Sequence, residues 1–384
     1  MKVFEKQVQE RAVAEFHASS LQKNYRTIQD LVPHQAILAM IKADAYGHGA
    51  AWAARQLVGM SGLYGFGVAT LEEGAEVRGA LTAKMRRTSI IVLSGATPWS
   101  NEVGQYCEFY GLTPVITSEG SWAAFLKGGW PSRLPYELQF DTGMNRLGIS
   151  LQNVRSVVKS CQALPPEQHP QGIFSHLAIS ESAVSRLTQL QLKKFKVLKS
   201  EFLSVVPGAR FHLANSGGIW NHQAMDLEDL TDVVRPGIAL YGVPPWLGAS
   251  SRGLVPVMTF KVSVAAIHCL KPGDSIGYGG TFRVTGNDRV IAAILAAGYA
   301  DGIHRSLGPQ GRVWLDGKLT RFLGVVSMDL CAVQCRAETQ VGAWAEILGP
   351  HTDPWVQAQA AGTIPYELFT SLTARIKRVY PEGL

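Results

Sequence analysis

The chain lacks the cysteine pattern of a secreted or metal-binding protein. Its five cysteines are odd in number and scattered, and no two of them form a CxxC pair. Cys331 and Cys335 stand four residues apart without a second pair or a histidine cluster nearby. We therefore expect neither a disulfide framework nor a metal site, but buried free thiols in a reducing compartment.

Long apolar runs and clustered charges are also scarce. The longest apolar stretch, residues 290–300, is too short to cross a bilayer, and residues 1–7 mix charges without the apolar core of a signal peptide. The net charge of +6 is spread along the chain, and residues 375–378 are its nearest approach to a basic run. Nucleic-acid binding needs clustered basic and aromatic side chains. We expect a cytoplasmic protein that binds neither membranes nor nucleic acids.

The chain is instead rich in side chains that form cores, with 46% hydrophobic and 17% charged residues. Its 384 residues exceed the usual size of a single core, so two domains are expected. Up to residue 243, short β-rich apolar runs alternate with helical patterns, which is typical of an α/β fold of the (β/α)₈ TIM-barrel type. The runs expected as strands are residues 36–41, 64–69, 89–94, 114–117, 136–141, 172–177, 210–214 and 233–240.

Amphipathic patterns predict a helix before the first strand, at residues 19–31, and helices between the strands, at residues 71–81, 121–127, 151–164 and 185–206. In the last of them, the apolar residues that recur at helical spacing are Leu187, Leu190, Leu198, Phe195 and Phe202. After residue 243 the helical periodicity fades and Gly, Asp and Pro separate short strands. We expect residues 1–243 to form the barrel and residues 244–384 a mostly β C-terminal domain, with strands at 258–270, 291–297, 312–315, 322–326 and 345–348.

A lysine stands at the end of the first expected strand. Lys42 follows the apolar run 36–41 and precedes a Gly-His-Gly turn. Partial desolvation at such a position disfavours the ammonium form and leaves a nucleophilic amine. More often a lysine at a strand end simply extends into solvent, so the other strand ends must decide between the two interpretations.

Polar residues also occupy the ends of other expected strands. In parallel barrels the carboxyl ends of the strands carry the reactive groups. A histidine in an apolar strand is usually a satisfied core residue, and an arginine beside a proline is usually on the surface. Several such residues at one rim favour a functional site. They are Arg146, His176, Asn215, Ser216 and Arg235.

One of these segments has the chemistry of an anion site. Asn215 and Ser216, followed by two glycines at the start of a helix, offer an amide, a hydroxyl and backbone N–H groups to a phosphate. Gly237 and Ile238 could add N–H groups from the neighbouring strand. A reactive amine together with a phosphate site indicates pyridoxal 5′-phosphate.

Eight motifs, in chain order and over nearly the whole length, resemble those of the alanine racemase family. They are KADAYGHG (42–49), FDTGMNRLG (140–148), HLANS (212–216), VRPGIALYG (234–242), YGGTF (278–282), GYADG (298–302), SMD (327–329) and TIPYE (363–367). The resemblance implies a pyridoxal-phosphate-dependent enzyme that interconverts L-alanine and D-alanine, for cell-wall synthesis or for alanine catabolism. It also implies a homodimer whose active sites are shared between the subunits.

The resemblance further implies roles for individual residues. Lys42 would carry the cofactor and act as the base on one face of the substrate α-carbon, and Tyr278 of the partner subunit would act on the other face. The residues that would hold the phosphate are Tyr46, Ser216, Gly237, Ile238 and Tyr366, with Asn215 beside them.

The remaining roles concern the ring and the substrate. His176 would lie against the pyridine ring, and Arg235 would face the ring nitrogen. Arg146 would contact the phenolic oxygen of the cofactor and help to bind the substrate, and the Met328 N–H would contact the substrate carboxylate. Tyr299 and Tyr366 would narrow the entrance to the active site.

Elementary chemistry fits these roles. Two bases on opposite faces exchange the α-proton directly, whereas one base would have to move or wait for water. A tyrosine with a pKa near 10 needs a stabilised phenolate to act as a base, and His176 with Arg235 could provide this. Arg235 has no proton to share, so it leaves the ring nitrogen unprotonated and weakens the electron sink. That fits a racemase better than a decarboxylase.

The chain departs from the family at position 139, where many members have a lysine that is carbamylated. Gln139 could orient Arg146 through a neutral hydrogen bond, and we expect no carbamate. A decarboxylase of the same architecture would usually place a carboxylate at the ring nitrogen and a cysteine in the second domain. A non-catalytic carrier would lack the second domain. A serine or broad-specificity racemase often has a smaller residue at the position of Tyr366.

Overall fold

The structure is a computed structural model that describes residues 10–82, 85, 87–94, 99–127 and 134–381. Contacts divide it into two compact units. The barrel unit comprises residues 21–240 and 244–254, and the β unit comprises the residues up to Ser20 with 241–243 and 255–384. Residues 1–7, which were expected not to form a signal peptide, lie outside the described part of the chain.

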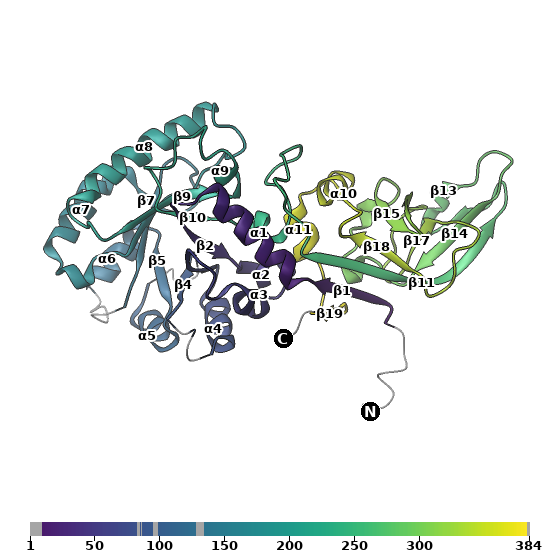
Figure 1. The fold of residues 1–384 in the computed structure, drawn as a ribbon, viewed down its shortest axis with the longest axis horizontal. Coiled ribbons are helices and arrows are strands. Elements are labelled where there is room, and N and C mark those ends of the chain that lie inside the picture. Colours follow the sequence, from purple (N-terminus) through teal and green to yellow (C-terminus); the bar gives the residue numbers. More distant parts are fainter. Residues whose placement is uncertain (1–9, 83–84, 86, 95–98, 128–133, 382–384) are drawn as a thin grey trace. The chain divides into compact units, whose positions relative to one another are not determined.

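The core of the barrel unit is a closed ring of parallel strands, as the sequence predicted (Figure 1). Their order is β5-β4-β3-β2-β10-β9-β8-β6, and a further pairing of β5 with β6 closes the ring. Parallel strands covered on both faces are buried throughout, which explains their near-continuous apolar runs. The strands are β2 (Ala36–Met40), β3 (Leu63–Val68), β4 (Ser89–Val92), β5 (Thr113–Ile116), β6 (Glu137–Asp141), β8 (Gly172–Phe174), β9 (Arg210–Asn215) and β10 (Val233–Arg235), with the short β7 (Ile149–Ser150) beside β6.

Helices cover the outside of this ring in Figure 1. Local sequence sets their ends: Thr70 caps α4 and Ser100 caps α5 through side-chain oxygens, and Gly111 in the left-handed region ends α5. The helices are α1 (Ala18–Leu31), α3 (Ala50–Leu57), α4 (Leu71–Ala80), α5 (Asn101–Tyr110), α6 (Glu119–Lys127), α7 (Val154–Ala163), α8 (Arg186–Leu203) and α9 (Ser216–Trp220), with 3₁₀ turns at Leu151–Asn153, Pro166–Gln168 and Ile238–Tyr241. The segment α2 (Lys42–Gly47) is a turn with left-handed residues inside it.

The buried face of α8 differs from the predicted one at its first turns. Phe195, Leu198 and Phe202 are buried as expected, and the ring of Phe202 lies 5.5 Å from that of Phe140. Leu190, however, is 44% exposed, and Gln191 is fully buried in its place. The helix therefore turns a polar side chain toward the barrel near the strand ends.

The β unit is built around the long strand β11. Its first half pairs with β1 and β18, and its second half pairs with β14. An apolar cluster around Leu323 includes side chains of β14 and β17, which pair with each other. The strands are β1 (Ala12–Phe16), β11 (Met258–Leu270), β12 (Ser275–Ile276), β13 (Phe282–Arg283), β14 (Val290–Leu295), β15 (Arg312–Leu315), β16 (Lys318–Arg321), β17 (Cys331–Gln334), β18 (Trp344–Leu348) and β19 (Lys377–Val379). The helical elements are α10 (Pro354–Ala361), α11 (Pro365–Thr370) and 3₁₀ turns at Tyr278–Gly280, Tyr299–Asp301 and Arg305–Leu307.

Two sequence predictions about this unit need correction. The barrel was expected to begin at residue 1, but the residues up to Ser20 group with the β unit because β1 pairs with β11 and β19. A strand was expected at residues 322–326, but the Asp316-Gly317 turn starts β16 earlier, at Lys318. Only Phe322 then makes an isolated bridge, and Gly324 with φ +76° interrupts any continuation.

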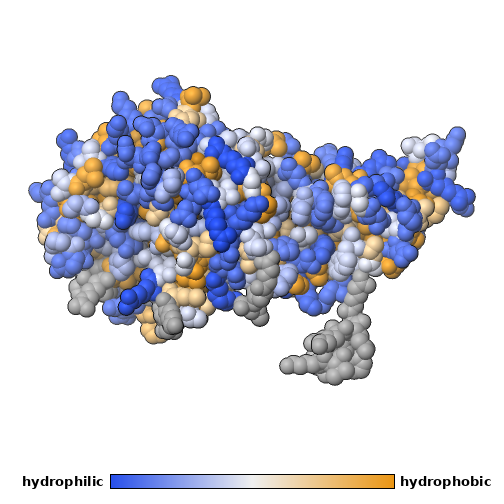
Figure 2. Space-filling model, viewed as in Figure 1, coloured by the Kyte–Doolittle hydropathy of each residue, from blue (hydrophilic) through white to orange (hydrophobic). Residues whose placement is uncertain are grey.

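The face shown in Figure 2 is mostly hydrophilic, and the cysteines form no disulfide among the described residues. Hydrophobic residues form small patches on that face. All five cysteines are free thiols; four are buried, whereas Cys269 on β11 is exposed, contrary to the expectation. Among the described residues, no helix has both the length and the apolar character needed to cross a bilayer.

Candidate active site

The carboxyl ends of the barrel strands bring the predicted polar residues together. Lys42 follows the end of β2 by two positions, Arg146 follows β6, His176 follows β8 and Arg235 ends β10. Arg235 Nη2 lies 3.2 Å from His176 Nδ1, and the charges of Arg146 and Arg235 both act on Lys42. The site therefore contains an unusual concentration of nitrogen bases and cations at one rim.

The Lys42 amine has the properties expected of a nucleophile. Burial lowers the pKa of Lys42 first, the charges of Arg146 and Arg235 lower it further, and Glu73 opposes them. No hydrogen bond or ion pair holds this amine among the described residues. A larger fraction of free amine near neutral pH follows from these surroundings.

The backbone after Lys42 has a conformation that the sequence did not predict. The four residues Ala43 to Tyr46 all lie in the left-handed region, with φ between 51° and 54°. Each non-glycine residue there costs about 1–2 kcal/mol. Hydrogen bonds hold the turn closed, from Ala45 N–H to the Ile41 carbonyl and from Gly49 N–H to the Asp44 carbonyl, both at 2.8 Å. Such strain is typical of functional sites, and here it sets the direction in which Lys42 leaves the strand.

Arg235 lies at the centre of a buried hydrogen-bond network. It is only 3% exposed, and burial lowers the pKa of its guanidinium to about 10. Its Nη2 donates to the Ser175 carbonyl at 2.7 Å and to His176 Nδ1 at 3.2 Å, and its Nη1 donates to His212 Nδ1 at 3.0 Å. Because a guanidinium can only donate, both imidazoles must accept through Nδ1. Their remaining proton is therefore on Nε2.

The buried carboxylate of Glu137 extends this network on the far side of His212. His212 Nε2 lies 3.2 Å from a carboxylate oxygen of Glu137, and both side chains are fully buried. The Tyr64 hydroxyl donates to the other oxygen of Glu137 at 3.2 Å. The buried charge of Arg235 thus has a counter-charge one imidazole away, which fixes its position in the barrel. The motifs in the sequence indicated no role for Glu137 or for the imidazole of His212, although a glutamate inside an apolar strand is a visible signal.

His176 is neutral at this rim. Burial lowers its pKa to about 3, and the charges of Arg235, Arg146 and Lys42 act in the same direction. With Nδ1 accepting from Arg235, the Nε2–H of a neutral His176 is a hydrogen-bond donor.

This neutral histidine predicts a loss of stability in acid. Between its unfolded pKa of 6.5 and its folded pKa of about 3 the unfolded chain binds more protons, so stability falls as pH drops through that window. We expect His176→Gln to reduce the fall in urea midpoint between about pH 7 and about pH 5. His34→Gln, at a side chain that is 72% exposed, should leave the fall unchanged. Equal slopes for wild type and His176→Gln would contradict the neutral assignment.

The strand ends also form a close-fitting cradle of hydroxyl and N–H groups. Ser216 Oγ accepts the N–H of Gly237 at 2.9 Å, and Asn215 Oδ1 accepts the N–H of Gly218 at 3.0 Å. A Cβ atom at Gly237 would lie 2.3 Å from the Tyr46 hydroxyl, so only glycine lets the two approach. Ile238 opens a 3₁₀ turn, whose first N–H groups have no partner within the turn.

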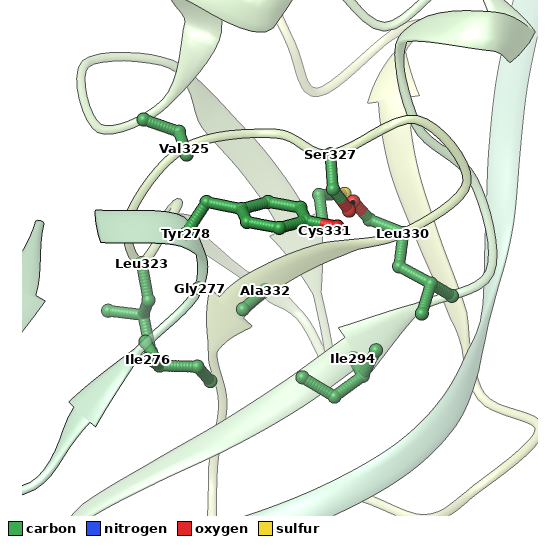
Figure 3. A pocket seen from close by; sticks show the side chains of 10 residues that line it. All are labelled: Ile276, Gly277, Tyr278, Ile294, Leu323, Val325, Ser327, Leu330, Cys331 and Ala332. Carbon is green, nitrogen blue, oxygen red and sulfur yellow. Dashed lines mark hydrogen bonds between the residues drawn. The ribbon is translucent and has the colours of Figure 1, made fainter. Parts of the chain in front are cut away.

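The other four predicted residues belong to the β unit. Tyr278 starts a 3₁₀ turn between Gly277 and Gly279, which both have positive φ, and its side chain is 74% exposed. Beneath it lies a cavity of about 390 Å³, lined by Ile276, Ile294, Leu323, Ser327, Leu330 and Cys331. Figure 3 shows the Tyr278 ring extending over this cavity toward Ser327.

The structure brings Tyr299 and Met328 side by side. Tyr299 N–H donates to the Ser327 carbonyl and Ala300 N–H to the Met328 carbonyl, both at 3.0 Å. The side chains of Tyr299 and Met328 are 43% and 53% exposed. Tyr366 lies on α11 and is half-buried.

Both parts of the chain match models of a known protein family. Residues 16–245 match the family model of the alanine racemase N-terminal domain, and residues 257–380 match that of the C-terminal domain. The chain belongs to the alanine racemase family. An alanine racemase of Rickettsia canadensis is 36% identical over 371 residues, which cover 94% of this chain and 97% of the relative.

Solved structures of alanine racemases have the same fold. The enzyme of a D-cycloserine-producing Streptomyces lavendulae superposes with a TM-score of 0.87 at 28% identity, covering 98% of this chain and 99% of that one. The alanine racemase of Bartonella henselae, solved with covalently bound pyridoxal phosphate, gives a TM-score of 0.82 at 30% identity, with 97% and 99% coverage.

The side chain at the family's variable position has a different partner from the one considered above. Gln139 could have oriented Arg146, but its Nε2 donates to the Leu147 carbonyl at 3.0 Å. Within the described chain no hydrogen bond joins Gln139 to Arg146, whose side chain is exposed. The loop is instead held by Asp141, whose Oδ1 accepts the N–H groups of Gly143 and the two residues that follow it.

A second polar residue that the sequence analysis missed is Gln191. Its Nε2 donates to the His176 carbonyl at 2.8 Å and to Thr142 at 3.1 Å, and its Oε1 accepts the Ala178 N–H at 2.8 Å. It thereby holds the backbone that follows β8 at two points, His176 and Ala178. Its spacing of four residues from Leu187 and from Phe195 was a signal that could have placed it on the buried face of α8. Its polar side chain favoured the opposite, exposed assignment.

Proposed function

We propose that this protein interconverts L-alanine and D-alanine with pyridoxal 5′-phosphate as its cofactor. The observation that carries the proposal is the match of both alanine racemase domains, in order, to a chain whose Lys42 amine stands in a cationic, partly buried site. The alternative of a serine or broader-specificity racemase is less favoured, because the relatives that match over nearly the whole chain are alanine racemases.

The barrel rim fits this cofactor chemically. Lys42 offers the amine, while Tyr46, Asn215, Ser216 and the N–H groups at Gly237 and Ile238 would hold the phosphate, with Tyr366 as a further donor. The Gly237 N–H would then exchange its present acceptor, Ser216 Oγ, for a phosphate oxygen. The glycine at 237 is part of the fit, since any larger residue there would meet the Tyr46 hydroxyl. When bound, the cofactor supplies the electron-withdrawing system that makes the substrate Cα–H acidic.

Arg235 would face the ring nitrogen of the cofactor. Its Nη atoms are engaged by His176, His212 and backbone carbonyls, but its Nε–H has no partner among the described residues. A guanidinium donates a hydrogen bond without giving up its proton. The ring nitrogen would therefore stay unprotonated, which limits charge delocalisation and favours simple proton exchange over decarboxylation.

Two bases would exchange the α-proton. Lys42 would act on one face and Tyr278 of a second copy on the other, within a homodimer whose active sites are shared. Tyrosine has a pKa near 10 and is a weak base unless its phenolate is stabilised. The Nε2–H of His176, left free to donate because Nδ1 accepts from Arg235, could supply that stabilisation.

The remaining residues would bind and select the substrate. Arg146 would contact the phenolic oxygen of the cofactor, and the Met328 N–H would contact the substrate carboxylate. Tyr299 and Tyr366 would narrow the entrance, so that a methyl side chain passes and longer ones are disfavoured.

A racemisation assay on the cofactor-loaded protein tests the proposal. We expect alanine to be racemised in both directions, serine more slowly, and arginine and lysine hardly at all. Faster turnover of serine or arginine than of alanine would favour the broader-specificity racemase. Carbon dioxide release without racemisation would instead indicate a decarboxylase.

A further inference from the structure

The Glu73 carboxylate departs from the usual pattern at the start of α4. Thr70 Oγ1 accepts the Glu73 N–H at 3.3 Å, which is the first half of a capping box. In the second half, the glutamate would return to the N–H of Thr70. Instead, Glu73 Oε2 accepts the Ala69 N–H at 2.7 Å and Oε1 accepts the Ala43 N–H at 2.8 Å.

The second of these bonds reaches the residue next to Lys42. Ala43 is the first of the four left-handed residues, so its N–H lies where the chain leaves β2 and enters the strained turn. Hydrogen bonds to an ionised carboxylate are about twice as strong as neutral ones. The carboxylate therefore ties the turn to the end of β3 and the start of α4, which belong to the rigid barrel.

Glu73 is also the opposing charge beside Lys42. Burial and the charges of Arg146 and Arg235 lower the pKa of Lys42, and Glu73 is the group that acts in the raising direction. Removing its charge should lower the pKa of Lys42 further. Loss of the hydrogen bond from the Ala43 N–H should allow the turn to move, so that the Lys42 amine is no longer held in one direction.

We propose that Glu73 is a positioning residue for Lys42, whose carboxylate clamps the left-handed turn to the barrel and so fixes where the amine points. This inference rests on the proposed function, because it assumes that Lys42 reacts with the cofactor. It concerns a residue to which neither the sequence motifs nor the proposed mechanism gives a role.

Glu73→Gln tests the clamp, because an amide has one accepting oxygen for two N–H groups and carries no charge. Glu76→Gln is the matched control, an exposed glutamate one turn later on α4. The readouts are the rate at which added pyridoxal phosphate becomes attached to Lys42, followed by its visible absorbance, the pH midpoint of that rate, and kcat with KM.

In Glu73→Gln we expect the attachment rate and kcat to fall by about 10- to 100-fold, with little change in KM, because the amine is misdirected rather than removed. The pH midpoint should move to lower pH. Glu76→Gln should behave as wild type. A Glu73→Gln variant with the attachment rate and midpoint of the control would overturn the inference, even though the wild type racemises alanine.

A second variant, Glu73→Asp, keeps the inference testable if Glu73→Gln does not fold. Glu73→Asp keeps the charge but is one methylene shorter, so it cannot span the same two N–H groups without movement. Slower attachment with an unshifted midpoint supports the clamp, and wild-type attachment overturns it. Failure of the wild type itself to attach the cofactor or to racemise alanine would instead overturn the proposed function.

Discussion

Lys42→Ala is expected to abolish racemisation of alanine in both directions. The substitution removes the amine that would hold the cofactor and the base on one face of the α-carbon, so we expect a loss of at least about 1,000-fold in kcat. The phosphate cradle around Ser216 and Gly237 is untouched, so the cofactor should still bind, but reversibly and without the absorbance of the attached form.

The measurement is the visible spectrum before and after gel filtration, together with the rate of D-alanine formation. Lys23→Ala, at an exposed lysine on α1, serves as the control and should keep both. Retention of the attached cofactor in Lys42→Ala would show that another lysine carries it and would remove the basis for every role assigned at the barrel rim.

Much of the barrel was predictable because its signals are local. All eight strands were found from apolar runs, and the polar residues that follow them mark the rim, since parallel strands in one barrel end on the same side. The last strand was predicted too long: β10 ends at Arg235, because Pro236 cannot continue the ladder and a 3₁₀ turn begins at Ile238.

What the sequence concealed depends on partners that are distant along the chain. The Glu137 carboxylate on β6 and the His212 imidazole on β9 meet across β8, which lies between their strands. Only the geometry of Arg235 settles which nitrogen of His176 and of His212 carries the proton. The left-handed turn after Lys42 was equally hidden, because alanine and aspartate have no preference for four successive positive φ angles.

The placement of β1 was hidden for a related reason. The strand at Ala12–Phe16 precedes the barrel in sequence, and its short apolar run does not say which sheet it joins. Its partners are β11 and β19, more than two hundred residues away. Pairings of this length are decided by tertiary packing and cannot be read from a local pattern.

Tyr278→Phe separates the two faces of the proposed reaction. The substitution removes one hydroxyl from a side chain that is 74% exposed in the single chain, so the fold and the attached cofactor should be retained. We expect racemisation to fall by about 100- to 10,000-fold, the range for loss of a general base. Exchange of the α-proton with solvent should be lost far more from L-alanine than from D-alanine, because Lys42 still serves the D-face.

Mixing variants tests whether the phenol comes from a second copy. If Lys42→Ala and Tyr278→Phe subunits exchange, each mixed dimer contains one site with both native bases, so random reassortment should restore about a quarter of wild-type activity. No recovery after demonstrated subunit exchange would place both bases in one chain. Equal loss of α-proton exchange from both enantiomers in Tyr278→Phe would show that this phenol is not a face-specific base, whichever subunit supplies it.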